Sequence, residues 1–267
     1  MSTLLQISDA HFGTEQEPVV TALAALSEHL QPQLVVLSGD ITQRARRSQF
    51  EAARRFVDDL QRPVIAIPGN HDIPLYNIAA RMFSPYGNYS AAFGDELEPQ
   101  FESEAFLIVC ANTTRPRRHK DGEISEQQVI RISERMRRGS REQVRVVVTH
   151  QPVHVIRPED EANLLHGHEL AVRAWAEAGA DIIMGGHIHL PYVRALNDRF
   201  TDLPRKLWAV QAGTAVSWRI RGRVPNSVNV LKHSRGDLVC SVERWDYDAT
   251  TNAFRCVNAE SLHLDRR

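Results

Sequence analysis

The chain has 267 residues, of which 42% are hydrophobic and 24% charged, and its formal net charge is −1. These values are ordinary for a globular protein, and they argue against a nucleic-acid coat or a polybasic membrane anchor. No apolar run is long enough for a transmembrane helix, and the N-terminus lacks the basic region of a signal peptide. Three cysteines without a pairing motif fit a reducing compartment, so we predict a cytoplasmic protein.

The first third of the chain alternates between strand-like and helix-like segments. Almost continuously apolar runs predict short strands, and the helical spacing of Leu23, Leu26 and Leu30 predicts the first helix. Such alternation indicates parallel strands that are covered by helices on both faces. In chain order, the predicted elements are strand 3–7, helix 17–30, strand 33–37, helix 46–60 and strand 63–67.

The middle of the chain begins with a break in this pattern. Residues 73–104 carry aromatic, glycine, proline and acidic residues without a period, so we predict an irregular insertion or cap. Order returns with a strand at 105–112, and Ser125 followed by Gln128 predicts a capped helix start. The other predicted elements of this part are strand 143–150, helix 168–178 and strand 181–184.

The last third of the chain contains strand-like segments without helices between them. Glycine, proline and asparagine separate these segments, which is typical of antiparallel strands. The four segments cover residues 206–212, 227–233, 237–247 and 253–260. Since no repeat or linker divides the sequence, we predict one domain, residues 1–267, built on two sheets.

Side chains that can bind metal ions follow five of the predicted strands. Taken singly, Asp40 and Asn70 fit ordinary turns, and His150 fits a hydrogen-bonded core histidine. Taken together they share one position, because the carboxyl ends of parallel strands meet at one edge of a sheet, where sites assemble. The residues at these strand ends are Asp9, His11, Asp40, Asn70, His71, Asp72, His150, His187 and His189.

The order and spacing of these residues resemble the calcineurin-like metallophosphoesterase superfamily. The matching motifs are Asp9-x-His11, Gly39-Asp40, Gly69-Asn70-His71-Asp72, a lone His150 and Gly186-His187-x-His189. The resemblance implies an α/β fold, the αββα sandwich, with two packed mixed β-sheets flanked by helices and antiparallel strands at the C-terminal end. It also implies an enzyme that hydrolyses phosphoesters with two divalent metal ions.

The resemblance further implies how the ligands are divided. One metal would be held by Asp9, His11 and His189, the other by Asn70, His150 and His187, and Asp40 would bridge them. Carboxylate, imidazole and amide ligands without thiolate suit Mn or Fe, and Zn as an alternative. In such a centre a metal-bridging hydroxide attacks phosphorus.

Two further residues of the third motif receive roles from the resemblance. His71 would protonate the departing oxygen or steady the phosphoryl oxygens. Asp72 would orient an imidazole, although capping of a following helix is an equally good interpretation.

Within the superfamily the sequence most resembles class III cyclic nucleotide phosphodiesterases and glycerophosphodiesterases. The supporting stretches are GEISEQQ at 122–128 and GTAVSWRIRGRVPNSVNVL at 213–231, whereas Asn112 and Gln151 replace residues that relatives often carry as Asp and His. We therefore predict a small-molecule phosphodiester substrate that lies near Asn112. A phosphomonoesterase, a nuclease and a non-catalytic scaffold are less favoured, and the near-zero charge argues against a stable nucleic-acid partner. The sequence leaves a homodimer open.

A basic loop at 113–122 suggests a second substrate class. Arg115, Arg117 and Arg118 would clamp an acidic substrate, although a solvated charged loop explains them equally well. A clamp would favour the alternative function, a pyrophosphatase acting on a nucleotide sugar such as a UDP-linked lipid precursor. That function would need an apolar groove, for which the cap offers Phe83, Tyr86, Tyr89 and Phe93.

Overall fold

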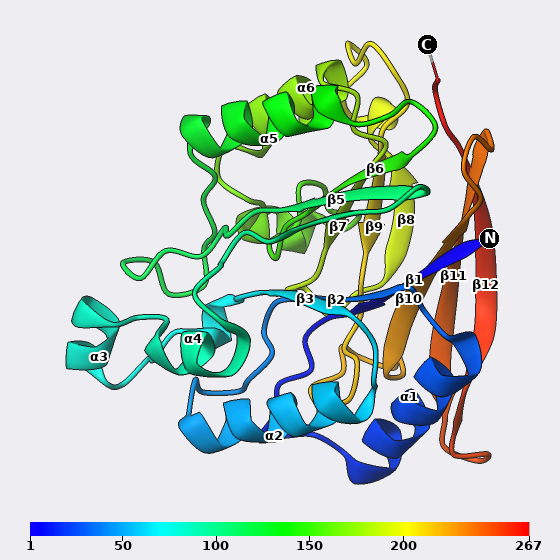
Figure 1. The fold of residues 1–267 in the computed structure, drawn as a ribbon. Coiled ribbons are helices and arrows are strands. Elements are labelled where there is room, and N and C mark those ends of the chain that lie inside the picture. Colours follow the sequence, from blue (N-terminus) through cyan, green and yellow to red (C-terminus); the bar gives the residue numbers. More distant parts are fainter. Residues whose placement is uncertain (267) are drawn as a thin grey trace.

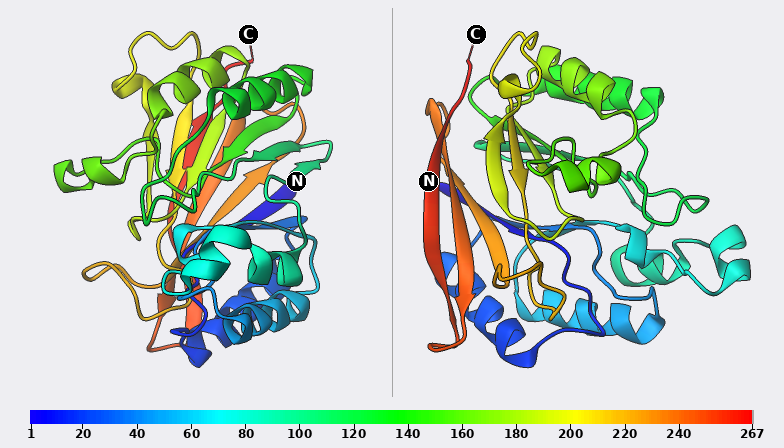
Figure 2. Two further views of the ribbon diagram at one scale, coloured as in Figure 1. Left: turned by 90° about the vertical axis from the view of Figure 1, so that its left-hand side faces the viewer. Right: turned by 180° about the vertical axis from the view of Figure 1, so that it is seen from behind.

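The computed structural model of the chain, described for residues 1–266, consists of two β-sheets packed face to face between two layers of helices (Figure 1). Each sheet has six strands and contains both parallel and antiparallel pairs. Helices α1 and α2 cover the outer face of the first sheet, and α5 and α6 cover the outer face of the second (Figures 1 and 2). The predicted αββα sandwich is therefore confirmed.

The first sheet has the strand order β12-β11-β10-β1-β2-β3. Strands β1, β2 and β3 are parallel, as the sequence pattern predicts, and β10, β11 and β12 continue the sheet with antiparallel pairs. Its elements and their helices are β1 (Ser2–Ile7), α1 (Glu17–Leu30), β2 (Leu34–Ser38), α2 (Arg47–Asp59), β3 (Val64–Ile67), β10 (Ser227–His233), β11 (Val239–Asp248) and β12 (Ala253–His263).

The second sheet has the strand order β4-β5-β6-β7-β9-β8, in which β5, β6, β7 and β9 are parallel. Helix α5 begins as predicted, because Ser125 Oγ accepts a hydrogen bond from the Gln128 amide (3.2 Å). Its elements and helices are β4 (Gln100–Glu102), β5 (Phe106–Cys110), α5 (Glu126–Arg138), β6 (Val144–Val148), α6 (His168–Glu177), β7 (Ile182–Gly185), β8 (Tyr192–Ala195) and β9 (Trp208–Gln211).

Three apolar layers hold the sandwich together. Between the sheets, Val36 of the first packs in one cluster with Val146 and Met184 of the second. The outer faces pack on the helices, with Phe50 of α2 in one cluster and Trp175 of α6 in the other. Strands that bury both faces read as continuous apolar runs, which explains why the sequence shows no alternation in them.

Two predictions for the elements need correction. The first of the four C-terminal segments was expected in the antiparallel addition, but it forms β9 of the second sheet, apart from the other three segments. There β9 pairs in parallel with β7 on one side and antiparallel with β8 on the other, because the chain reverses through β8 and the short helical turn Leu196–Asp198. Residues 73–104 are also more regular than expected. They contain α3 (Ile78–Phe83), α4 (Gly87–Phe93) and β4, and α3 projects away from both sheets (Figures 1 and 2).

Candidate metal centre

The predicted ligands lie in turns with an unusual backbone. Five of them have a positive φ: Asp9 (51°), His11 (47°), Asp40 (47°), His187 (74°) and His189 (57°). Residues other than glycine rarely adopt this left-handed backbone conformation, and those that do cluster at functional sites. The turns after β1, β2 and β7 are therefore bent to aim these side chains at a common place.

Hydrogen bonds between main chain and side chains lock these turns together across the two sheets. The His187 amide donates to both carboxylate oxygens of Asp9 (3.1 and 3.0 Å). The imidazole of His150 donates from Nδ1 to the carbonyl oxygen of Ser38 (2.9 Å), at the end of β2. Both bonds join a turn of the second sheet to a turn of the first, so the site lies where the two sheets meet.

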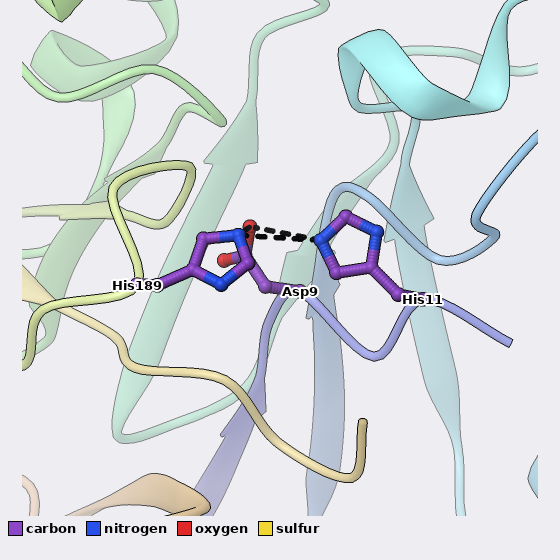
Figure 3. Close-up of side chains that lie close together, drawn as sticks. All are labelled: Asp9, His11 and His189. Carbon is purple, nitrogen blue, oxygen red and sulfur yellow. Dashed lines mark hydrogen bonds and ion pairs between the residues drawn. The ribbon is translucent and has the colours of Figure 1, made fainter. Parts of the chain in front are cut away.

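One group of potential ligands consists of Asp9, His11 and His189 (Figure 3). The Nε2 atoms of the two imidazoles are 3.3 Å apart, and His189 Nε2 lies 3.4 Å from Asp9 Oδ1. Figure 3 shows both rings and the carboxylate pointing toward one another from the turns after β1 and β7. Two imidazole nitrogens and a carboxylate oxygen facing one point match the donor set of a divalent metal.

A second group consists of Asp40, His150 and His187, and Asn70 lies beside it. Asp40 Oδ1 is 3.3 Å from His150 Nε2, whereas Asp40 Oδ2 is 3.8 Å from His11 Nε2 in the first group. Asn70 Oδ1 lies 3.3 Å from the same nitrogen of His150. Asp40 thus turns one oxygen to each group, which is the arrangement that a bridging carboxylate requires.

The hydrogen bonds of the histidines orient them for metal binding. Nδ1 of His150 and Nδ1 of His189 contact the carbonyl oxygens of Ser38 and Arg219, so Nε2 is the nitrogen of each ring that faces the site. Burial opposes a positive charge on His150, but the Asp40 carboxylate outweighs this effect and raises the pKa of His150 to about 9, so a metal at this nitrogen would replace a proton. Burial lowers the pKa of His187 to about 3, so its ring is neutral. The Nδ1 atom of His187 is buried without a hydrogen-bond partner among the residues described, as expected for a ligand atom whose partner is a metal.

Asp40 is suited to the charged form that a metal requires. Burial opposes its ionisation, but the neighbouring imidazole of His150 outweighs this effect and holds the pKa of Asp40 well below its usual range. The carboxylate also accepts a hydrogen bond from the His71 amide at Oδ1 (2.8 Å).

Gly39, directly before Asp40, is required by the close packing of the site. Its φ is +96°, and a Cβ atom built there would lie 2.3 Å from His150 Nδ1. The turn after β2 can therefore approach the imidazole of His150 only without a side chain at this position.

A cavity of about 490 Å³ opens over both groups. Potential ligands form its floor, and residues from three other segments form its walls. The lining residues are Asp40, Asn70, His71, Lys120, Asp160, Asn163, His187, Ile188, His189, Trp218, Arg219, Ile220 and Arg221.

Arg219 is a site residue that the sequence interpretation missed. Its Nη1 donates to Gln43 Oε1 (2.9 Å) and lies 3.3 Å from His71 Nε2 and 3.5 Å from His11 Nδ1. His71 in turn donates from Nδ1 to the carbonyl oxygen of Gln43 (2.9 Å), so its Nε2 is the acceptor that faces Arg219. The sequence signal for Arg219 is its position in the stretch 213–231, which resembles phosphodiesterases of the superfamily but does not mark Arg219 itself as a functional residue.

A model of the family described as calcineurin-like phosphoesterase matches residues 2–191 of the chain. The chain belongs to this family. It is a metal-dependent phosphoesterase, and the family together with the two ligand groups indicates a dinuclear site for divalent metals.

Two relatives by sequence are phosphodiesterases. A probable cyclic nucleotide phosphodiesterase of Synechococcus is 25% identical over 204 residues, which cover 72% of this chain and 75% of the relative. The glycerophosphodiester phosphodiesterase GpdQ of Enterobacter lignolyticus is 35% identical over 82 residues, covering 26% of this chain and 29% of the relative.

Solved structures of two phosphatases share the fold. A dimetal phosphatase from Danio rerio has a TM-score of 0.68 at 13% identity and covers 99% of both chains. A purple acid phosphatase from yellow lupin has a TM-score of 0.70 at 13% identity, covering 99% of this chain and 54% of the lupin chain. Among the residues described in the phosphoesterase, no helix is long and apolar enough to cross a membrane.

The basic loop of the phosphoesterase does not bring its arginines into the cavity. Arg115 donates to the carbonyl oxygens of Asn112 and Thr114, and Arg118 pairs with Glu123 (2.9 Å). Together with Arg117 these arginines line a separate hollow under α3, and Lys120 is the loop's cationic side chain at the metal cavity. Arg115 and Arg118 therefore make contacts within the loop and to Glu123, away from the metal cavity.

Asn112 and the cap aromatics also serve the structure. Asn112 Oδ1 accepts from the amide of Thr114 (3.0 Å), and its Nδ2 donates to Tyr86 Oη (3.2 Å). Tyr89 is buried in the core, whereas Phe83 is 84% exposed on α3. These rings do not form a common groove, so the apolar groove expected for a UDP-linked lipid is not present among the residues described.

Asp72 has neither of the two roles considered for it. Its carboxylate accepts hydrogen bonds from the amides of Ile41 (3.0 Å), Thr42 (2.7 Å) and Gly69 (2.9 Å). It thus ties the turn that carries Asn70 to the turn that carries Asp40, and orients the backbone of the site, not an imidazole.

Proposed function

We propose that the chain is a phosphodiesterase of small molecules, of the cyclic nucleotide or glycerophosphodiester type. The observation that carries the proposal is the carboxylate of Asp40, placed between two groups of ligands at the floor of one cavity. In this proposal Asp9, His11 and His189 would hold one Mn or Fe ion, Asn70, His150 and His187 would hold the other, and Asp40 would serve both. Such metals, when bound, would supply a nucleophile at neutral pH and stabilise charge on the phosphoryl oxygens.

The chain's own residues then position the substrate. Arg219 presents a guanidinium over the same floor and can donate to a phosphoryl oxygen, where negative charge grows in the transition state. His71 holds this guanidinium through Nε2 and is fixed by the Gln43 carbonyl. We propose that His71 acts on the phosphoryl group as one unit with Arg219.

The preference for diesters is supported by both sequence relatives, whose names describe phosphodiesterases. The alternative, a pyrophosphatase of UDP-linked lipids, has no comparable support, because the loop arginines and the cap aromatics do not line the cavity. We also propose a cytoplasmic location, because the three cysteines are unpaired, as is usual in a reducing compartment.

The test is a substrate panel with metal-depleted protein reloaded with Mn. The panel contains bis(p-nitrophenyl) phosphate, p-nitrophenyl phosphate, cyclic AMP, glycerophosphoethanolamine and a UDP-sugar. We expect hydrolysis of the diesters, and its loss in Asp40→Ala but not in the exposed control Asp58→Ala. Cleavage confined to the monoester or to the UDP-sugar contradicts the proposal.

A further inference from the structure

The rim of the metal cavity carries an exposed apolar wall. Trp218 is 64% exposed and Ile220 is 41% exposed, and both line the cavity. Arg219, which lies between these two residues, contacts His71. Arg221, which follows Ile220, forms an ion pair with Asp160 (2.9 Å). The segment thus alternates, with its two cations making contacts inside the protein and its two apolar side chains left at the rim.

The wall is fixed relative to the metal ligands. The Trp218 amide donates to the carbonyl oxygen of Thr14 (3.1 Å), and the preceding residue, Ser217, is buried, its carbonyl accepting from Asn226 Nδ2 (2.7 Å). The carbonyl of Arg219 accepts from Nδ1 of His189 (2.6 Å). The residue directly after Trp218 is therefore hydrogen-bonded to a predicted metal ligand.

The indole of Trp218 is free to receive a ligand. In the described part of the chain no aromatic ring or guanidinium stacks on it, whereas Trp175 is fully buried and the other two tryptophans are at least half-buried. An indole is a large apolar surface, which proteins usually bury. Its exposure at the mouth of a cavity, on a well-fastened loop, suits the stacking of a flat ring.

We propose that Trp218, supported by Ile220, is the base-binding wall of the site, so that the preferred substrate is a phosphodiester that carries a nucleobase. The inference rests on the proposed function and selects between its two substrate types, because a glycerophosphodiester lacks the ring. Stacking of a base on an aromatic side chain strengthens binding roughly tenfold to a hundredfold. Asn163, which lines the same cavity, offers an amide donor and acceptor to the edge of such a base.

Calorimetry with a matched pair of ligands tests the wall without any need for turnover. AMP carries adenine at the sugar carbon where ribose 5-phosphate carries a hydroxyl group, and each ligand is titrated into the Mn-loaded protein. We expect AMP to bind at least about tenfold more tightly, with this preference kept in Trp218→Phe, lost in Trp218→Leu, and unchanged in Ile130→Ala, an exposed apolar residue of α5. Equal binding of the two ligands, or a preference that survives in Trp218→Leu, overturns the inference.

The same variants separate this inference from the proposed function. Hydrolysis of cyclic AMP and of glycerophosphoethanolamine is measured for the wild type and for Trp218→Leu. We expect the ratio of kcat/KM for cyclic AMP over glycerophosphoethanolamine to fall about tenfold or more in the variant. Failure of the wild type to cleave either diester refutes the phosphodiesterase, whereas an unchanged ratio refutes only the base wall.

Discussion

At the scale of single residues, Arg219 shows how a long-range contact completes the site. Its guanidinium comes from the loop after β9, yet it lies against His71, which follows β3, and against His11, which follows β1. A cation at this point can stabilise the charge of the transition state without displacing a metal ligand.

Replacement of Arg219 by alanine should therefore impair catalysis and leave the metals in place. We expect kcat for a phosphodiester to fall by about a hundredfold, the usual effect of losing one such donor, and Arg219→Lys to recover part of it. Steady-state kinetics and metal analysis of the purified variants measure both effects. Arg47→Ala, on an exposed ion pair of α2, is the control, and loss of metal in Arg219→Ala would contradict the assigned role.

Asp72 acts on the backbone, and its replacement should be visible as lost stability. One oxygen of Asp72 accepts a hydrogen bond from the Thr42 amide, and the other accepts from the amides of Ile41 and Gly69. In Asp72→Asn an NH2 group replaces one of these oxygens and cannot accept, so at least one buried amide loses its partner. We expect the free energy of unfolding of the metal-free protein to fall by about 1–3 kcal/mol in urea denaturation. The exposed pair residue Asp58 gives the matched variant Asp58→Asn, and an equal loss in both variants would refute this role.

At the scale of elements, the site depends on turns that follow strands. Gly39→Ala tests this dependence, because the added Cβ would meet the imidazole of His150. We expect metal affinity to fall by about ten- to a hundredfold, as when the orientation of a ligand is lost. Gly94→Ala is the control, since Gly94 also has a positive φ (+89°) but no atom lies within 4 Å of its added Cβ. Equal metal affinity in both variants would show that the approach of Gly39 is not needed.

The same scale explains what the sequence could predict. The ligands at the ends of β1, β2, β3, β6 and β7 could be predicted from the sequence, because apolar strands and the polar residues that follow them are local features. Arg219 and Trp218 were not, since their place depends on how the loop after β9 is fastened to Thr14 and His189. The parallel pairing of β9 was missed for the same reason, because pairing is set by a distant partner and not by the strand's own residues.

At the scale of the whole molecule, the centre joins the two sheets. His150 and Gln6 each bridge them, with Gln6 Nε2 donating to Ser38 Oγ (3.0 Å) and to the Gly185 carbonyl (3.0 Å). A metal that binds ligands from both sheets must stabilise their packing, since a ligand of the folded state alone shifts the unfolding equilibrium. We expect chelation to lower Tm by several degrees and Mn to restore it, with a much smaller response in Asp40→Ala. An unchanged Tm on chelation would contradict this coupling.

The most direct test of the account is a metal titration of phosphodiesterase activity. Metal-free protein receives increasing equivalents of Mn, while bound metal and the hydrolysis of bis(p-nitrophenyl) phosphate are measured on the same samples. The account predicts that activity rises to a plateau at two bound ions per chain and that Asp40→Ala gains neither ion tightly. Full activity without metal, or two bound ions without hydrolysis of any phosphodiester, would contradict it.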